Sequence, residues 1–159
     1  MPHLKAYKKP LSTLIATLLL TAALAFPALA ANKYVTVKKD GVNIRSKPST
    51  KSEILWQVFK DFPLQVIDQK GDWLHTKDFE GDTGWIYKTL VDKDKRVIVK
   101  VNTANMRIGP GKNYELVATV KYGVVFTPLE KESGWIKVKH EDGTTGWIYK
   151  DLLWPSAPF

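Results

Sequence analysis

The sequence predicts an all-β protein made of two tandem copies of one small barrel. Residues 82–90, DTGWIYKTL, recur 62 positions later as TTGWIYKDL, so the chain repeats itself. Short stretches that alternate apolar and polar side chains follow one another, with turn residues between them, as β-strands do. No stretch after residue 30 keeps helical spacing over three turns. These three observations favour strands over helices in both copies.

The first 30 residues are predicted to be a cleavable secretory signal peptide. Three lysines precede an uncharged apolar run, residues 11–26, and Ala28, Leu29 and Ala30 follow it. A positive segment, an apolar segment and a small-residue site in this order are typical of a signal peptide, here cleaved after Ala30. The alternative is a retained anchor, although the run of ~16 residues is shorter than the roughly 20 that span a bilayer.

The rest of the chain is moderately basic and has no cysteine. Three of the 24 Lys and Arg residues and none of the 16 acidic residues lie in the first 30 positions, which leaves a net charge of +5. Export without disulfides fits a bacterial envelope protein, because small extracellular domains of eukaryotes usually carry them. We therefore expect a periplasmic or secreted protein with no integral membrane segment after signal cleavage. Export and the weak charge also argue against nucleic acid as a partner.

The repeat covers the chain beyond the predicted signal peptide, and the two copies align without a gap. We expect domains at residues 33–91 and 96–153, with a short tail at 154–159. The few residues between the copies predict a stiff tandem. Five short strands in about 60 residues favour a small closed or half-closed barrel in each copy.

Strand alternation separates the predicted core from the predicted outer face. In residues 135–139, Ile136 and Val138 share one face, and Trp135 shares the other with two lysines. A large apolar side chain left in water forgoes ~1.5–3 kcal/mol of burial, so grouped aromatic residues need a covering loop or a ligand. The same alternation places three aromatic side chains of each copy on the outer side: Trp73, Trp85 and Tyr87, then Trp135, Trp147 and Tyr149.

These aromatic residues have two possible roles. Trp73 and Trp135 each follow a turn, and we expect them to contact a ligand. Trp85 and Trp147 are expected to lie partly under the loop that follows Asn-x-Arg in each copy, with ligand contact as the alternative. The tyrosines combine an apolar ring with a polar tip, which suits a wet groove.

Arg45 and Arg107 each end a predicted strand before a loop that contains proline. One interpretation is that the guanidinium caps loop carbonyls and stacks on a neighbouring tryptophan. The other is that it binds a ligand carboxylate through a bidentate pair of hydrogen bonds. The sequence leaves both open.

The ordered set N-x-R-x-x-P, then GDW or SGW, then a glycine turn leading to TGWI, occurs in both copies. It resembles the bacterial SH3-like (SH3b) family, over roughly residues 33–153. This resemblance implies two tandem five-stranded SH3-like barrels. It also implies a non-catalytic binding module of the cell envelope, often for peptidoglycan or another wall component. The acidic first loop and the late Pro-x-x-Tyr of eukaryotic SH3 domains are missing, which speaks against proline-rich ligands.

Residues for catalysis, metal binding or a cofactor are not found in a repeated arrangement. There is no cysteine, and His75 and His140 do not occupy equivalent positions of the two copies. Acidic residues cluster in turns, where solvated charges are common. A glycosidase needs two carboxylates across a cleft, and so small a barrel offers little room for one. We therefore predict no catalytic residues, no metal site and no cofactor.

The sequence thus favours a secreted module that binds peptidoglycan or a cell-wall peptide through its outer aromatic residues. The alternative is an adaptor that recruits an envelope enzyme or assembly, and a weak hydrolase or enzyme accessory is a third possibility. The copies differ at Trp56/Ala118, Phe59/Lys121 and Phe62/Val124. We expect these differences to tune binding, which leaves open whether one copy or both bind.

Overall fold

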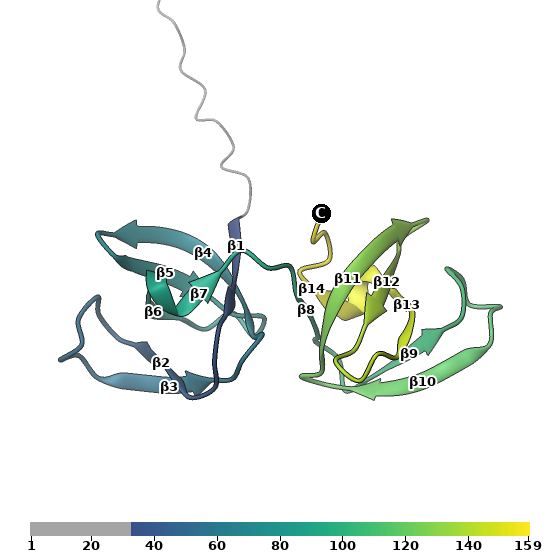
Figure 1. The fold of residues 1–159 in the computed structure, drawn as a ribbon, viewed down its shortest axis with the longest axis horizontal. Coiled ribbons are helices and arrows are strands. Elements are labelled where there is room, and N and C mark those ends of the chain that lie inside the picture. The colour runs from purple at the N-terminus through teal and green to yellow at the C-terminus, as the bar shows by residue number, and fades with distance from the viewer. Residues whose placement is uncertain (1–32) are drawn as a thin grey trace, which may run out of the picture.

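A computed structural model describes residues 33–159, which fold into two barrel-like domains side by side (Figure 1). The predicted signal peptide lies outside the described residues. Within residues 33–159, no helix has the length and apolar character needed to cross a membrane. The all-β fold with two tandem domains that the sequence predicts is confirmed.

The first barrel, residues 33–92, is one antiparallel sheet with the strand order β3-β2-β6-β5-β4-β1-β7. A short 3₁₀ helix, η1 (Lys88–Leu90), joins its last two strands. The strands are β1 (Lys33–Val37), β2 (Val42–Arg45), β3 (Ile54–Val58), β4 (Pro63–Lys70), β5 (Trp73–Lys77), β6 (Thr83–Tyr87) and β7 (Val91–Asp92).

The second barrel, residues 97–154, repeats this topology with the order β10-β9-β13-β12-β11-β8-β14. Its 3₁₀ helix is η2 (Lys150–Leu152). The strands are β8 (Val97–Val99), β9 (Thr103–Arg107), β10 (Leu116–Lys121), β11 (Val125–Glu132), β12 (Trp135–Lys139), β13 (Thr145–Tyr149) and β14 (Leu153–Trp154). Each sheet has seven strands where the sequence predicted five. One of the two additional strands in each barrel, β7 or β14, has only two residues and is too short to show an alternating pattern.

The core of each barrel follows the predicted alternation. Ile86 on β6 and Ile136 and Ile148 on β12 and β13 are fully buried. Leu74 points inward with them, and Thr76, also buried, donates a hydrogen bond of 3.1 Å from its hydroxyl to the Gly84 carbonyl. The inward face of β5 is therefore apolar except for the Thr76 hydroxyl, which has a hydrogen-bond partner.

Glycine in the repeated TGW sequence allows two strands to approach closely. A Cβ added at Gly84 would lie 2.4 Å from Cγ2 of Ile44 on β2. A Cβ added at Gly146 would lie 2.4 Å from Cγ of Met106 and 3.0 Å from the Arg107 carbonyl oxygen on β9. Only a residue without a side chain fits between these strands and the core. This contact explains why both copies keep glycine directly before the tryptophan.

We predict that Gly146→Ala lowers the free energy of unfolding by about 1–3 kcal/mol, because the new methyl group overpacks the core next to Met106. Urea denaturation followed by tryptophan fluorescence measures the change. Thr145→Ala, at an exposed position of the same strand, is the control. Equal stability of the wild type and Gly146→Ala would contradict the close approach.

The two barrels meet at an apolar junction. Ile98, on β8 of the second barrel, is fully buried and belongs to the core cluster of the first barrel. Trp154 of β14 packs against the same cluster, and its ring contacts Tyr34 edge to face at 5.2 Å. On another part of the junction, the rings of Phe79 and Tyr122 lie 5.2 Å apart. The barrels therefore share buried apolar surface as well as a chain connection.

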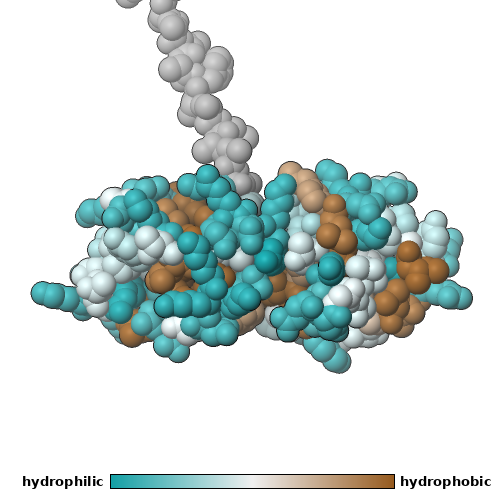
Figure 2. Space-filling model, viewed as in Figure 1, coloured by the Kyte–Doolittle hydropathy of each residue, from teal (hydrophilic) through white to brown (hydrophobic). Residues whose placement is uncertain are grey.

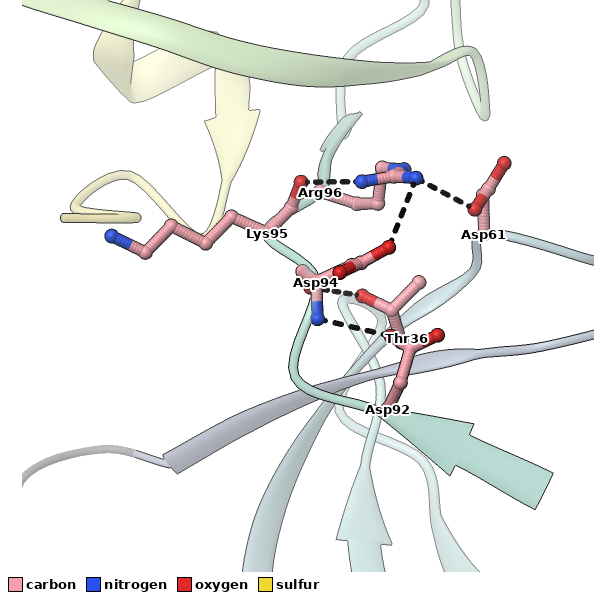
Figure 3. Close-up of polar contacts among 6 residues, drawn as sticks. All are labelled: Thr36, Asp61, Asp92, Asp94, Lys95 and Arg96. Atoms are coloured by element: carbon pink, nitrogen blue, oxygen red, sulfur yellow. Dashed lines mark hydrogen bonds and ion pairs between the residues drawn. The ribbon is translucent and has the colours of Figure 1, made fainter. Parts of the chain in front are cut away.

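Polar contacts hold the connecting segment, residues 93–96, against the first barrel (Figure 3). The Arg96 guanidinium lies 3.1 Å from Oδ1 of Asp61 and 3.6 Å from Oδ2 of Asp94. The Thr36 hydroxyl donates a hydrogen bond of 2.6 Å to the Asp94 carbonyl. Because the segment is bonded to the first barrel at Asp94 and at Arg96, its backbone follows the barrel surface instead of looping away from it.

The Tyr122 hydroxyl donates a hydrogen bond across the junction to the Glu80 carboxylate. This bond raises the pKa of Tyr122 to about 12. Since the folded pKa lies above the ordinary value, the stabilising effect is present below pH 10.0 and is lost as the pH rises through about 12.

The junction explains many of the differences between the copies. Tyr122, Ile98 and Trp154 stand where the first copy has Lys60, Thr36 and Asp92. A barrel surface that packs against a neighbour needs apolar groups, whereas the equivalent surface of the other barrel does not.

The residues that the sequence analysis expected to tune binding pack in or against the core of the first barrel. Phe62 is buried in the first core, and its ring contacts Phe59 at 5.2 Å and Phe79 at 5.9 Å. Phe79 in turn contacts Tyr122 of the second barrel. Trp56 packs against the first core. Packing thus accounts for these differences without reference to a ligand.

We predict that Tyr122→Lys with Trp154→Asp, which places first-copy residues in the second copy, weakens the junction and leaves both barrels folded. NMR ¹⁵N relaxation should give one rotational correlation time for the wild type and different times for the two barrels of the variant. Thr119→Gln, a first-copy residue placed on an exposed strand, is the matched control. A variant that tumbles like the wild type would contradict a junction held by these side chains.

Candidate functional site

One tryptophan and one tyrosine face each other across neighbouring strands in each barrel. Trp73 pairs with Tyr87 between β5 and β6, and their rings lie 5.3 Å apart at 77°. Trp135 pairs with Tyr149 between β12 and β13, at 5.6 Å and 67°. Edge-to-face contacts of this kind stabilise the two rings against each other. Each barrel thus carries an ordered aromatic pair on the outer side of its sheet.

The third aromatic residue of each barrel lies two cross-strand pairs further along, on the same face of the sheet. The His75 ring stacks on Trp85 with centroids 4.7 Å apart and planes 12° apart. In the second barrel, the Lys137 ammonium lies 5.9 Å from the Trp147 ring centroid. Cross-strand neighbours therefore cover part of both indoles, a contribution that the sequence did not indicate.

The alternation gave the direction of these rings but not their exposure. Trp73, Trp85 and Tyr87 are partly buried. In the second barrel, Trp135 and Trp147 keep 8% and 7% of their surface exposed, whereas Tyr149 keeps 38%. Neither of these two tryptophans belongs to the core cluster of its barrel. The indoles are thus wedged into the outer surface, between neighbouring side chains.

The arginines of the repeated Asn-x-Arg sequence close the loop that follows each of them. Nη1 of Arg45 donates a hydrogen bond of 2.8 Å to the Ser52 carbonyl. Nη1 of Arg107 donates one of 2.7 Å to the Tyr114 carbonyl. The loop-capping role is therefore observed in both copies. A guanidinium has five N–H donors, so the bond to the loop leaves others for a second acceptor.

A cavity of about 590 Å³ opens beside the aromatic pair of the second barrel. Arg107, Trp135 and Tyr149, three of the residues predicted from sequence, line it together. Trp147 is not among the lining residues. The remaining lining residues are Thr103, Ala104, Asn105, Lys112 and Leu152.

The sequence reasoning missed Lys112 and Asn105 as lining residues. Asn105 belongs to the repeated Asn-x-Arg sequence, so the repeat itself was a signal for it. Lys112 has no such signal, because the first copy has Thr50 there. Its place at the cavity depends on how the loop between β9 and β10 folds back.

The first barrel has a carboxylate at the corresponding edge of its aromatic pair. The Tyr87 hydroxyl donates a hydrogen bond of 3.0 Å to Asp72, and the Lys88 ammonium lies 2.6 Å from the same carboxylate. The bonds from Lys88 and Tyr87 hold the pKa of Asp72 below its ordinary value. The same contacts raise the pKa of Lys88 and of Tyr87.

Three acidic side chains, Asp78, Glu80 and Asp82, come close enough to one another to hold a metal ion. Oδ1 of Asp78, however, accepts hydrogen bonds from the backbone amides of Glu80 (3.0 Å) and Asp82 (2.9 Å). Burial raises the pKa of Asp78, while these amides act in the opposite direction. The carboxylate therefore fixes the turn before β6.

A second cavity, of about 790 Å³, lies at the junction and is lined by residues of both barrels. Arg96 and Asp61, which form an ion pair there, are among its lining residues. It contains none of the site residues predicted from sequence. The cavity beside Trp135 is therefore the one that matches the sequence prediction.

Comparison with known proteins assigns both copies to one domain family. Residues 38–93 and residues 100–155 each match the bacterial SH3 domain. The chain belongs to this family. Among its relatives is YrvJ of Bacillus subtilis (strain 168), which is inferred to be an N-acetylmuramoyl-L-alanine amidase. YrvJ is 28% identical over 155 residues, which cover 88% of this chain and 30% of YrvJ. The chain thus spans less than a third of that relative.

Solved structures also resemble the chain at low sequence identity. An NlpC/P60 family protein from Bacillus cereus is 15% identical with a TM-score of 0.36, and the match covers 76% of this chain and 55% of that one. The endolysin LysPBC5 CBD is 16% identical with a TM-score of 0.31, with 77% and 93% covered. Similarity at this level does not bear on function.

We predict that Asp72→Asn destabilises the protein at pH 7, because Tyr87 and Lys88 lose a charged partner. The folded pKa of Asp72 lies below its ordinary value of 3.8, so its contribution is complete above that pH. The stability difference between wild type and variant should therefore shrink as the pH falls below 3.8 and through the lowered pKa. Urea denaturation of both proteins at several pH values measures it.

A difference between wild type and Asp72→Asn that stays constant down to the lowest pH would contradict this account. Asp142→Asn is a useful comparison. The pKa of Asp142 is also lowered, first by its hydrogen bond with the Thr144 backbone, at a position away from the aromatic pair.

Proposed function

We propose that this protein is a non-catalytic binding module of the bacterial cell envelope that recognises peptidoglycan or a cell-wall peptide through its outer aromatic residues. The observation that carries the proposal is the ordered Trp–Tyr pair, present in both barrels at equivalent positions. Both matched segments are bacterial SH3 domains, which accounts for most of the described residues. The relative YrvJ, inferred to cleave an amide of the cell wall, supports the wall as the target.

The surface around the aromatic pairs has the chemistry that such a ligand needs. The exposed ring of Tyr149 and the partly exposed rings of Trp73 and Tyr87 offer apolar contact to the face of a sugar or to a peptide side chain. The net charge of +5 beyond the predicted signal peptide favours approach to an anionic wall polymer. Apolar side chains reach the visible surface in separate patches on both barrels, with hydrophilic side chains between them (Figure 2).

The predicted location agrees with this role. A signal peptide directs export, and peptidoglycan lies outside the cytoplasmic membrane. A periplasmic or secreted location therefore follows from the same proposal as the ligand. Neither barrel brings a repeated set of nucleophile, acid and base together, so we assign binding and not hydrolysis.

One observation favours an adaptor as the second candidate function. Strands β3 and β10 are edge strands of their sheets. Each exposes two adjacent apolar side chains: Ile54 and Leu55 in the first barrel, and Leu116 and Val117 in the second. An edge strand with exposed apolar residues can pair with a partner chain. If the protein does not bind sacculi but captures one envelope protein in stoichiometric amount, this function is favoured over the first.

We predict that the purified protein pellets with purified sacculi and that Trp73→Ala with Trp135→Ala raises the apparent Kd at least about tenfold, because both aromatic pairs are lost. Circular dichroism checks that the fold is intact. Ile67→Ala with Leu129→Ala is the matched control, since these residues are equivalent in the repeat and exposed by 46% and 42%.

The control variant should bind sacculi like the wild type. Binding that survives in the folded tryptophan variant would remove the aromatic pairs from the proposal. Failure of the wild-type protein to bind sacculi at all would overturn the proposed function.

A further inference from the structure

The two aromatic pairs differ in the residue directly before the tryptophan. In the first barrel this residue is Asp72, whose carboxylate is bonded to Tyr87 and Lys88. In the second barrel it is Gly134, which has no side chain and a φ of +84°. The backbone contact is the same in both, since the amide of Lys88 or Lys150 donates to the carbonyl of Asp72 or Gly134. The copies thus share this hydrogen bond, but they differ by one carboxylate and in backbone conformation, because Asp72 does not have a positive φ.

The cavity beside the second aromatic pair has a basic lining. Arg107 and Lys112 line the cavity there, and none of its lining residues is acidic. Trp135, with 8% of its surface exposed, and Leu152 give the cavity apolar walls. Tyr149, with 38% exposed, lies beside them. The volume of about 590 Å³ is within the range of pockets for small ligands.

Lys150 has its own acidic partner in the second barrel. Its ammonium lies 2.9 Å from Oδ1 of Asp151, the neighbouring residue of η2, and this contact raises the pKa of Lys150. In the first barrel, Lys88 pairs instead with Asp72 beside Tyr87. Asp151 also interacts with Tyr149, but it is not among the residues that line the cavity, whereas Asp72 directly precedes Trp73.

We propose that the second barrel is the main ligand-binding copy and that its cavity takes a carboxylate group of a wall peptide. Arg107 and Lys112 pair with the carboxylate, and Trp135 and Tyr149 contact the adjoining part of the peptide. In the first barrel, Asp72 occupies the edge of the aromatic pair with a carboxylate of the protein itself and disfavours a ligand carboxylate by charge repulsion. This inference rests on the proposed function, because it names the copy and the ligand group used.

Single substitutions separate the two barrels in the sacculus binding assay. Trp135→Ala should raise the apparent Kd at least about tenfold, and Trp73→Ala should raise it less than about threefold. Equal losses for the two variants, or a larger loss for Trp73→Ala, would overturn the assignment to the second barrel. Such a result would leave the proposed function intact, since sacculi would still be bound through aromatic residues.

A substitution at Gly134 tests the role of the missing carboxylate. Gly134→Asp brings an acid to the second aromatic pair and should raise the apparent Kd at least about tenfold. Gly134→Asn is the matched control, because asparagine has the same shape and tolerates positive φ equally well but carries no charge. It should stay within about threefold of the wild type. Equal weakening by both substitutions would show that backbone strain, and not charge, is responsible, and would overturn the proposal.

Chemical modification of the sacculi tests whether the protein recognises their carboxyl groups. Sacculi whose carboxyl groups have been converted to amides with carbodiimide and ammonia should bind the wild-type protein at least about tenfold more weakly than untreated sacculi. Sacculi taken through the same procedure without carbodiimide are the control. Undiminished binding to the amidated material would overturn carboxylate recognition. Absence of binding to untreated sacculi would instead count against the proposed function.

Discussion

The close crossing of the TGW strand over the Asn-x-Arg strand is the constraint on which the rest of each barrel depends. Gly84 and Gly146 lie so near the neighbouring strand that a side chain there would enter the core. This contact fixes the direction of every residue that follows on the strand. Ile86 and Ile148 turn inward, and the tryptophan and tyrosine on either side turn outward. Because alternation has a period of two, a register shift by one residue would exchange core and outer face.

The outer aromatic residues owe their order to the strands beneath them. Trp73 and Trp135 lie directly opposite a tyrosine on the next strand, so the backbone register brings each pair into contact. Arg45 and Arg107 each donate a hydrogen bond to the loop that follows them, which fixes the position of that loop. A ligand would thus meet rings and a loop that already have defined positions, which reduces the entropy lost on binding. The same scaffold serves both barrels, and the side chains added to it differ.

Much of the fold was predictable from the sequence, because repeats and alternation report directly on topology. The inward direction of Leu74, Ile136 and Val138 and the outward direction of Trp73 and Trp135 required only the period of a strand. The exposure of the rings was not predictable. Burial of a ring such as Trp135, which is 8% exposed, depends on residues far apart in the chain, and no local pattern encodes it. The cavity and Lys112 were missed for the same reason.

The junction is the other part that local patterns do not reveal. Ile98 looks like any inward residue of β8, yet it completes the core of the first barrel. Trp154 is the first residue of the predicted tail, yet it forms β14 and contacts Tyr34 of the first barrel. Contacts between residues far apart in the chain depend on how two finished surfaces meet.

The junction uses different side chains from the two copies, so the order of the two copies along the chain matters. Ile98 and Trp154 belong to the second copy, yet they pack against the core of the first copy. With the copies exchanged, Thr36 and Asp92 would bring a hydroxyl and a carboxylate to an interior that has no partner for them. A third unit appended by simple duplication would meet the same mismatch. The two copies are therefore not interchangeable at this junction.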